Sequence, residues 1–324
     1  MLGLVGDIGG TNARFGLVGP GKAGQAVDSI QALAVAEFSS VEEALQHYLQ
    51  SNGNPLVEAA VIAVATPVLD DYLEMTNSHW AFSQQAVARK FGFRRLRFVN
   101  DFTALAYSLP WLQPQQLCSL GGPENIVSHG VKAVLGPGTG LGVSAVIPAG
   151  ESWVALQGEG GHTTLFAQNL RESEIFDCMS RLLQHEEANR HLSYERLLSG
   201  SGLEFTYRAL MQTDGFPVVT KTAPQILQAG LSGEDPACRE ILDIFCSQLG
   251  QRASDLAVTT GATGGVYIGG GIVPRMQNFL IESNFRTAFE NKGRMTSYVQ
   301  NIPTHLILET YAALTGAAYL LSVM

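Results

Sequence analysis

The strongest constraint on the fold is a pattern of strand, glycine-rich turn and strand that occurs twice in the chain. Apolar runs at 2–5 and 15–18 flank the first turn, Asp7-Ile-Gly-Gly-Thr-Asn12. The second turn, Gly136-Pro-Gly-Thr-Gly-Leu-Gly142, is flanked in the same way. Two short apolar runs joined by a glycine turn are typical of a β-hairpin. The sequence therefore predicts two similar units, each of which begins with a hairpin.

Strand-like and helix-like segments alternate along the rest of the chain. Residues 96–99 are typical of a strand and residues 102–109 of a helix, with Asn100 and Asp101 at the junction. A third glycine cluster, Gly269–Gly271, also follows a strand-like run. Such alternation predicts an α/β architecture.

Two domains are expected from the length of 324 residues. The proline- and glutamine-rich stretch 110–116 is the clearest boundary signal in the first half. We predict a smaller α/β domain made of 1–110 plus 301–324 and a larger one made of 111–300.

Composition argues against several classes of protein. The formal net charge of −9 argues against nucleic-acid binding, which needs clustered Lys and Arg. No CxxC pair occurs among the four cysteines, which we expect to be reduced thiols: Cys118, Cys178, Cys238 and Cys246. The sequence shows no signal peptide and no apolar run of membrane-spanning length. We therefore expect a cytoplasmic protein with no membrane partner.

Standard phosphate-binding motifs do not account for the glycine turns. Residues 16–22 approach a Walker loop, but Ala23 stands where that motif has Ser or Thr. A dinucleotide-binding turn leads into a helix, whereas a strand-like run follows Asn12. Glycine permits φ > 0, so two such turns can form backbone anion nests that clasp a polyphosphate, with Asp7 holding Mg²⁺. One such turn alone is better explained as a tight hairpin.

The three glycine segments resemble the phosphate-1, phosphate-2 and adenosine segments of the actin-like ATPase superfamily. Within it, the chain resembles the bacterial glucokinases of the proteobacterial type. Four further segments carry this resemblance: Met75-Thr-Asn-Ser-His-Trp80, Val99-Asn-Asp-Phe-Thr103, Glu159-Gly-Gly-His162 and Tyr194-Glu-Arg-Leu-Leu-Ser-Gly200. The segments follow the family order over nearly the whole chain. The resemblance implies two actin-like (ribonuclease H-like) domains with an interdomain cleft, usually in a homodimer.

The implied activity is ATP-dependent phosphorylation of D-glucose at its 6-hydroxyl, which gives glucose 6-phosphate and ADP at the entry to glycolysis. ATP and Mg²⁺ are the implied cofactors, and Asp7 is the implied metal ligand. The residues implied to bind the nucleotide are Asp7, Gly9, Gly10, Thr11, Asn12, Gly138, Thr139, Gly140, Gly270 and Gly271. Those implied to bind glucose are Asn100, Asp101, Glu159, His162 and Glu195.

Asp101 is the implied catalytic base, which would accept the proton of the 6-hydroxyl. The alternative is that Asp101 only caps the helix that follows, because Asp and Asn are both favoured caps. One helix needs only one capping residue, and Asn100 is also available. Since a helix N-terminus stabilises a nearby carboxylate, we expect a lowered pKa for Asp101 and hence a weak base.

A zinc site is an alternative interpretation of Glu159 and His162. The related repressor and kinase family has a zinc-binding cysteine cluster after a similar element. Here only the lone Cys178 follows, so we expect no zinc and assign both residues to the sugar.

Three other residues are predicted to serve packing. Trp80 and Phe82 are expected in the core rather than stacked on a sugar, and Gly316 is expected to allow close packing near the C-terminus.

Other functions stay open at this stage. A kinase for fructose, mannose or an amino sugar is the nearest rival. A non-catalytic sugar sensor on the same fold and an actin- or chaperone-like ATPase are further alternatives.

Overall fold

The computed structural model describes residues 2–19, 26–124, 127–187 and 190–324. Its contacts divide the chain into two compact units. Unit 1 comprises Met1–Gln116, Ala145–Gln157 and Glu309–Met324, and unit 2 comprises Leu117–Ser144 and Gly158–Leu308. The Walker-like segment 16–23 lies partly outside the described residues.

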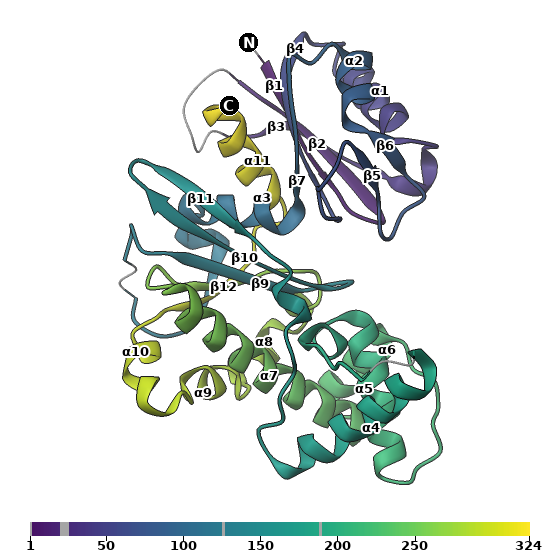
Figure 1. The fold of residues 1–324 in the computed structure, drawn as a ribbon, viewed down its shortest axis with the longest axis vertical. Helices are drawn as coiled ribbons and strands as arrows, with labels where there is room; N and C mark the ends of the chain where they lie inside the picture. The colour runs from purple at the N-terminus through teal and green to yellow at the C-terminus, as the bar shows by residue number, and fades with distance from the viewer. Residues whose placement is uncertain (1, 20–25, 125–126, 188–189) are drawn as a thin grey trace. The chain divides into compact units, whose positions relative to one another are not determined.

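Unit 1 is built around a five-stranded sheet with the strand order β3-β2-β1-β4-β7 (Figure 1). Its strands are β1 (Leu2–Ile8), β2 (Asn12–Val18), β3 (Asp28–Ala34), β4 (Val57–Val64) and β7 (Arg95–Asn100). β1 and β2 form the predicted antiparallel hairpin. β1, β4 and β7 run parallel, with Asp7 beside Ala63 and Val64 beside Asn100. The carboxyl ends of these three strands therefore lie at one edge of the sheet.

Helices cover both faces of this sheet. One face carries Leu4, Ile62 and Phe98, which share a core with buried residues of α1 (Val41–Ser51) and α2 (Gln84–Phe91). α3 (Asp101–Ser108) and α11 (Ala312–Val323) pack side by side against the same strands (Figure 1). Successive side chains of a strand point to opposite faces, and a Cβ on Gly3 would meet Leu321 of α11. α11 and its neighbour α3 therefore cover the face opposite Leu4.

The ends of these helices follow local sequence signals. Ser40 and Ser83 accept hydrogen bonds from the backbone N–H groups of Glu43 and Ala86, at 3.2 and 3.1 Å, and cap α1 and α2. α2 ends at Gly92, whose φ of 70° is the left-handed conformation that favours glycine. A small hairpin of β5 (Tyr72–Glu74) and β6 (Ala81–Ser83) completes unit 1.

The packing predictions for the two aromatic residues are confirmed. Trp80 and Phe82 are buried. The indole N–H of Trp80 donates to the carbonyl oxygen of Phe38 at 3.1 Å, so its one polar group has a partner inside the protein.

The second large sheet has the strand order β11-β10-β9-β12-β13-β8. Its strands are β8 (Leu117–Gly121), β9 (Lys132–Pro137), β10 (Leu141–Ala149), β11 (Ser152–Gln157), β12 (Val266–Ile268) and β13 (Thr304–Ile307). β12 runs parallel to both β9 and β13. The carboxyl ends of β9 and β12 therefore bring the second and third glycine segments to one edge.

Unit 2 also contains the longest helix, α7 (Pro236–Thr260). The other α-helices of unit 2 are α4 (Leu170–Glu187), α5 (Gly200–Thr213), α6 (Ala223–Ser232), α8 (Gln277–Glu282), α9 (Phe285–Glu290) and α10 (Thr296–Gln300). Two short 3-10 helices, η4 (Gly160–His162) and η5 (Tyr194–Arg196), carry predicted sugar residues. None of the helices described is long and apolar enough to cross a membrane.

The unit boundaries differ from the predicted ones in three places. Residues 111–116 belong to unit 1, whose first segment ends at Gln116. Residues 301–308 belong to unit 2, because β13 pairs with β12, with Val266 beside Thr304. The segment Ala145–Gln157 belongs to unit 1 although it lies in the middle of the sequence. Its strand β11 is held there by side chains of α3 and α11. The Ala155 N–H donates to the Tyr107 hydroxyl of α3 at 3.1 Å. The Trp153 N–H donates to the Tyr319 hydroxyl of α11 at 2.8 Å.

Gly316 lies where α11 approaches the backbone of α3. A Cβ at this position would overlap the Ala104 carbonyl oxygen and lie 3.0 Å from Ser108 N. Only a residue without a side chain lets the two helices pack this closely.

We predict that Gly316→Ala lowers the melting temperature of the protein by about 5 °C, because the helices must separate at a cost of roughly 2 kcal/mol. Thermal unfolding followed by circular dichroism measures the change. Gly19→Ala is the control, since its Cβ would meet no atom of the described residues within 4 Å. Alanine has the higher helix propensity, so an unchanged or higher melting temperature for Gly316→Ala would contradict the packing argument.

Candidate active site

The first glycine turn closes the β1–β2 hairpin of unit 1. The Gly9 N–H donates to the Asn12 carbonyl oxygen at 2.9 Å. A Cβ on Gly10 would lie 2.6 Å from the carbonyl oxygen of Asn77, so glycine is required there for a close backbone approach. Thr11 is exposed at the tip of the turn, and its carbonyl oxygen accepts from the Val35 N–H at 2.9 Å.

Asp7 lies at the carboxyl end of β1, directly before this turn. Burial raises the pKa of Asp7, and the Arg14 guanidinium opposes that rise. Arg14 Nη1 donates to Asp7 Oδ2 at 3.1 Å from the neighbouring strand β2. The sequence analysis did not identify Arg14, although its pairing opposite Asp7 follows from the hairpin register.

Asn100 and Asp101 have separate roles at the junction of β7 and α3. Asn100 Oδ1 accepts from the backbone N–H groups of Phe102 and Thr103, at 3.0 and 3.3 Å, and so caps the helix. Asp101 is the first helical residue, and its Oδ1 also accepts from the Phe102 N–H at 2.9 Å. Because Asn100 already serves as the cap, capping alone does not explain Asp101.

The expectation of a lowered pKa for Asp101 is wrong. Burial, and then the negative charge of Asp7, raise the pKa of Asp101 to about 7. The backbone hydrogen bonds at the start of α3 act in the opposite direction but are weaker. The helix N-terminus stabilises the carboxylate, yet loss of water and a second buried carboxyl group outweigh it.

The second glycine turn joins β9 to β10 in unit 2. The Gly138 N–H donates to the Gly140 carbonyl oxygen at 2.8 Å, and the Gly138 carbonyl oxygen accepts from the Gly200 N–H at 2.9 Å. Thr139 is exposed between the two glycines. The turn is therefore fixed to the first residue of α5.

The third glycine segment lies against the second. The Ile272 N–H donates to the Pro137 carbonyl oxygen at 3.2 Å. Gly270 has φ of 83°, and a Cβ there would overlap the same carbonyl oxygen. The expected use of φ > 0 in the two turns is wrong, because Gly9, Gly10, Gly138 and Gly140 do not adopt positive φ; Gly270 of the third segment does.

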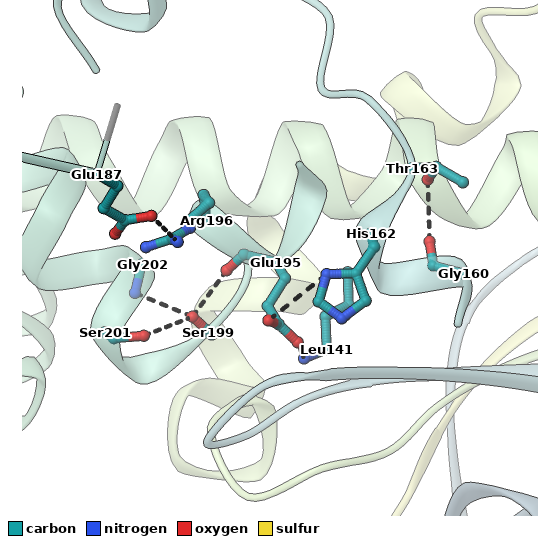
Figure 2. A network of polar contacts seen from close by, with 10 residues as sticks. All are labelled: Leu141, Gly160, His162, Thr163, Glu187, Glu195, Arg196, Ser199, Ser201 and Gly202. Atoms are coloured by element: carbon teal, nitrogen blue, oxygen red, sulfur yellow. Dashed lines mark hydrogen bonds and ion pairs between the residues drawn. The ribbon is translucent and has the colours of Figure 1, made fainter. Parts of the chain in front are cut away.

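Glu195 connects the second glycine turn to a predicted sugar residue, as Figure 2 shows. Glu195 Oε2 accepts from the backbone N–H of Leu141 at 2.9 Å, and Glu195 Oε1 lies 3.9 Å from His162 Nδ1. A Cβ on Gly140 would lie 2.5 Å from Glu195 Oε2. The carboxylate thus lies directly against the turn, which explains glycine at this position.

The loop that carries Glu159 and His162 is packed closely against β10. A Cβ on Gly161 would overlap the carbonyl oxygen of Leu141. Glu159 and His162 are exposed, with 57% of the His162 side chain accessible. The two glycines let the backbone lie close to the strand while both polar side chains reach solvent.

The structure brings the predicted residues together in two groups. Asp7, Asn100 and Asp101 lie at one sheet edge in unit 1, beside the first turn. In unit 2, Glu195 contacts the Gly138–Gly140 turn, His162 lies next to Glu195, and Gly270 lies against Pro137, directly before that turn. Within the described residues, no group of three or more His, Cys, Asp or Glu side chains is arranged to hold a metal ion.

Comparisons with known proteins identify the same family over nearly the whole chain. A family model described as Glucokinase matches residues 4–324. A glucokinase from Chromobacterium violaceum is 46% identical over 316 residues, which cover 97% of this chain and 88% of that protein.

Solved structures show the same fold. The crystal structure of a glucokinase from an Antarctic psychrotroph has a TM-score of 0.88 at 34% identity, covering 100% of this chain and 99% of the other. A ROK family glucokinase from Streptomyces griseus, solved in complex with glucose and AMPPNP, has a TM-score of 0.65 at 19% identity and covers both chains fully, at 100% each. The predicted α/β, actin-like fold class is thereby confirmed. With nearly every residue matched by that family's model and almost half of them identical in one of its members, the chain belongs to the glucokinase family.

Proposed function

We propose that the protein phosphorylates D-glucose at the 6-hydroxyl with ATP and releases glucose 6-phosphate and ADP, the reaction that feeds glucose into glycolysis. The observation that carries the proposal is Asp101, a half-buried carboxyl group with a raised pKa at the carboxyl edge of parallel strands, which helix capping does not explain. Membership of the glucokinase family supports the reaction class, and the S. griseus complex supports glucose and an ATP analogue as ligands of this fold.

Asp101 is the proposed base. A general base works best when its pKa lies near the operating pH, because it is then both deprotonated and able to take a proton. With a pKa of about 7, Asp101 meets this condition better than an unperturbed carboxylate would. In the proposed step, Asp101 accepts the 6-hydroxyl proton as that oxygen forms its bond to the γ-phosphorus and the bond to the ADP oxygen breaks.

The glycine turns are the proposed nucleotide site. Neither φ nor internal packing requires glycine at Gly9, Gly138 or Gly271, because a Cβ at each would meet no described atom closer than 3.7 Å. A polyphosphate that approaches the backbone N–H groups gives these glycines a reason. Gly10, Thr11, Asn12, Thr139, Gly140 and Gly270 complete the proposed contacts.

Asp7 is the proposed Mg²⁺ ligand. Mg²⁺ is usually held by one or two carboxylates, substrate phosphates and water. Asp7 and Asp101 raise the free energy of each other's ionised forms, so a cation beside them would be stabilised, and an Asp7 oxygen other than the one on Arg14 can face it. The residues present therefore fit Mg²⁺, which when bound supplies positive charge to the phosphates.

Polar residues of each unit are proposed as sugar ligands. Asn100 uses Oδ1 for the helix cap and its side chain also hydrogen-bonds Asp101. Its amide group is further proposed to bind the 3- and 4-hydroxyls. Glu159, His162 and Glu195 are proposed to bind hydroxyls nearer the anomeric carbon. A homodimer and a cytoplasmic location are proposed from the family resemblance.

A coupled ADP-release assay over glucose, fructose, mannose and glucosamine tests the function. We expect turnover with glucose far above that with the other sugars. Preference for another hexose would move the assignment to a related kinase. Sugar-independent ATP hydrolysis would favour the ATPase alternative, and sugar binding without ADP release would favour a sensor.

Asp101→Asn is predicted to lower kcat for glucose at least ~100-fold, because the amide cannot accept the proton. The dissociation constant for glucose should change little, since the amide keeps the size of the side chain. Steady-state kinetics and isothermal titration calorimetry measure the two effects. The exposed Asp70→Asn in the same unit is the control and should keep wild-type kcat; near-normal turnover in Asp101→Asn would remove the base assignment.

The raised pKa of Asp101 makes stability depend on pH. The folded state keeps the Asp101 proton between about pH 4 and 7, where the unfolded chain has lost it, so wild-type stability should fall as pH rises through this range. We predict that, as pH rises from 4 to 8, the free energy of unfolding of metal-free Asp101→Asn increases relative to that of the wild type, by up to about 4 kcal/mol. Melting temperatures of both proteins, measured in EDTA without nucleotide, test this. Parallel pH curves would show that the Asp101 pKa is not raised.

Gly138→Ala tests the phosphate cradle. Its Cβ would lie no closer than 3.9 Å to any described atom, so the melting temperature should not change. If phosphates approach the turn, the methyl group should raise the KM for ATP at least ~10-fold and leave the KM for glucose nearly constant. Gly19→Ala, with equally open surroundings, should change neither constant. An unchanged KM for ATP in Gly138→Ala would place the phosphates elsewhere.

A further inference from the structure

We propose that Arg252 is a positioning residue for the proposed hexose site. Its side chain holds the Glu159–His162 loop and the Tyr194–Glu195 turn in one fixed arrangement. The inference rests on the proposed function, because it concerns how that same site is kept in shape. No sequence motif pointed to Arg252, which lies in the middle of α7.

The two sugar-site segments are joined to each other through their backbones. The Tyr194 N–H donates to the Thr163 carbonyl oxygen at 3.0 Å, and the Leu165 N–H donates to the Leu192 carbonyl oxygen at 2.8 Å. This short antiparallel pairing links the residue after His162 to the residue before Glu195. A displacement of either segment is therefore transmitted to the other.

Arg252 contacts both segments. Its Nη2 donates to the carbonyl oxygen of Gly160 at 3.0 Å. Its guanidinium also lies over the ring of Tyr194, 5.6 Å from the centroid. Gly160 is adjacent to Glu159, and Tyr194 is adjacent to Glu195, so one side chain touches the immediate neighbours of two proposed sugar ligands.

Little space is left for the loop to move. A Cβ on Gly160 would lie 2.8 Å from Val143 Cγ1 on β10 and 3.0 Å from Arg252 Nη2 on α7. The loop backbone is thus enclosed between a strand and the guanidinium. The position of Tyr194 is further constrained at its hydroxyl, which is hydrogen-bonded to Asp255, and Asp255 pairs with Lys292.

Simple packing does not account for an arginine here. Arg252 is 7% exposed, its Nε is buried without a hydrogen-bond partner among the described residues, and burial lowers its pKa. An apolar side chain would fill the space without the cost of desolvating a charge. The favourable contacts of the guanidinium with the Gly160 carbonyl group and the Tyr194 ring offset this desolvation cost.

Gln248 extends the same arrangement by one helical turn. It is fully buried on α7, and its Nε2 donates to the Phe166 carbonyl oxygen at 3.0 Å and to Glu172 Oε2 at 2.8 Å. Residues four apart share one face of a helix. One polar stripe of α7 therefore anchors the sugar-site loop at Gly160 and the chain beyond it at Phe166.

The test separates positioning from general stability by comparing kinetic constants. Arg252→Met keeps an extended side chain over Tyr194 but removes the charge and the donor to Gly160. We expect it to raise the KM for glucose about tenfold, while kcat at saturating glucose and the KM for ATP stay within about threefold. Arg252→Lys, which keeps the charge and one donor, should recover part of the glucose KM.

Arg286→Met is the matched control. Arg286 lies in the same unit, donates to the carbonyl oxygens of Ile302 and Gln300 at 2.9 and 3.1 Å, and lies 4.8 Å from the ring centroid of Phe289. Its loss should lower the melting temperature without changing the KM for glucose. If Arg252→Met behaves like this control, or raises both KM values equally, the positioning role is wrong.

Two further measurements keep the outcomes distinct. If Arg252→Met does not fold, Arg252→Lys decides: an increased glucose KM supports the proposal, and a wild-type value overturns it. If the wild type shows no glucose-dependent ADP release, the proposed function fails independently. Arg252 is then judged by glucose titration calorimetry, where unchanged binding in the variant overturns the proposal and weakened binding supports it.

Discussion

The partial burial of two carboxyl groups at one sheet edge is the constraint on which the proposed chemistry depends. Asp7 lies near the end of β1 and Asp101 begins α3, and desolvation raises the pKa of each. Arg14 pairs with Asp7, so the positive charge stabilises one member of the pair more than the other. Asn100 takes the capping role. Burial and the charge of Asp7 give Asp101 a pKa of about 7. The sheet thus creates an asymmetry between two chemically identical groups, as an acid–base site requires.

The glycines of the three glycine-rich segments are needed for different physical reasons. These reasons change how the segments are interpreted. Only Gly270 uses positive φ, whereas Gly10 and Gly140 are needed because Asn77 and Glu195 lie too close for a Cβ. Gly9 and Gly138 have neither reason within the described chain. A glycine that its own protein does not require indicates a site where something else approaches the backbone. The residues that best support a phosphate site are therefore the ones with the fewest internal contacts.

The sequence predicted what depends on local order and missed what depends on long-range contacts. The hairpins and the position of Asp101 at the end of a strand follow from neighbouring residues. The pKa of Asp101 was mispredicted because helix position is visible in the sequence, while burial and the charge of Asp7 are not. Arg252 was missed for the same reason, since its partner Gly160 is 92 positions away. Likewise, β13 joins the second sheet by pairing with β12 and β8, which a boundary placed at residue 300 could not reveal.

Glu195 shows why the proposed sugar and phosphate contacts of unit 2 cannot be treated as independent. One carboxylate oxygen accepts the Leu141 N–H at the end of the second glycine turn, and the other lies beside His162. In the proposed site, a sugar hydroxyl bound to Glu195 would share the carboxylate that accepts a backbone N–H of this turn. Replacing Glu195 would therefore change both proposed sites at once. Arg252 contacts the sugar-site segments at Gly160 and Tyr194, and no contact joins it to the turn among the residues described. A substitution of Arg252 should for this reason separate effects on the proposed sugar site from effects on the proposed nucleotide site more clearly than a substitution of Glu195.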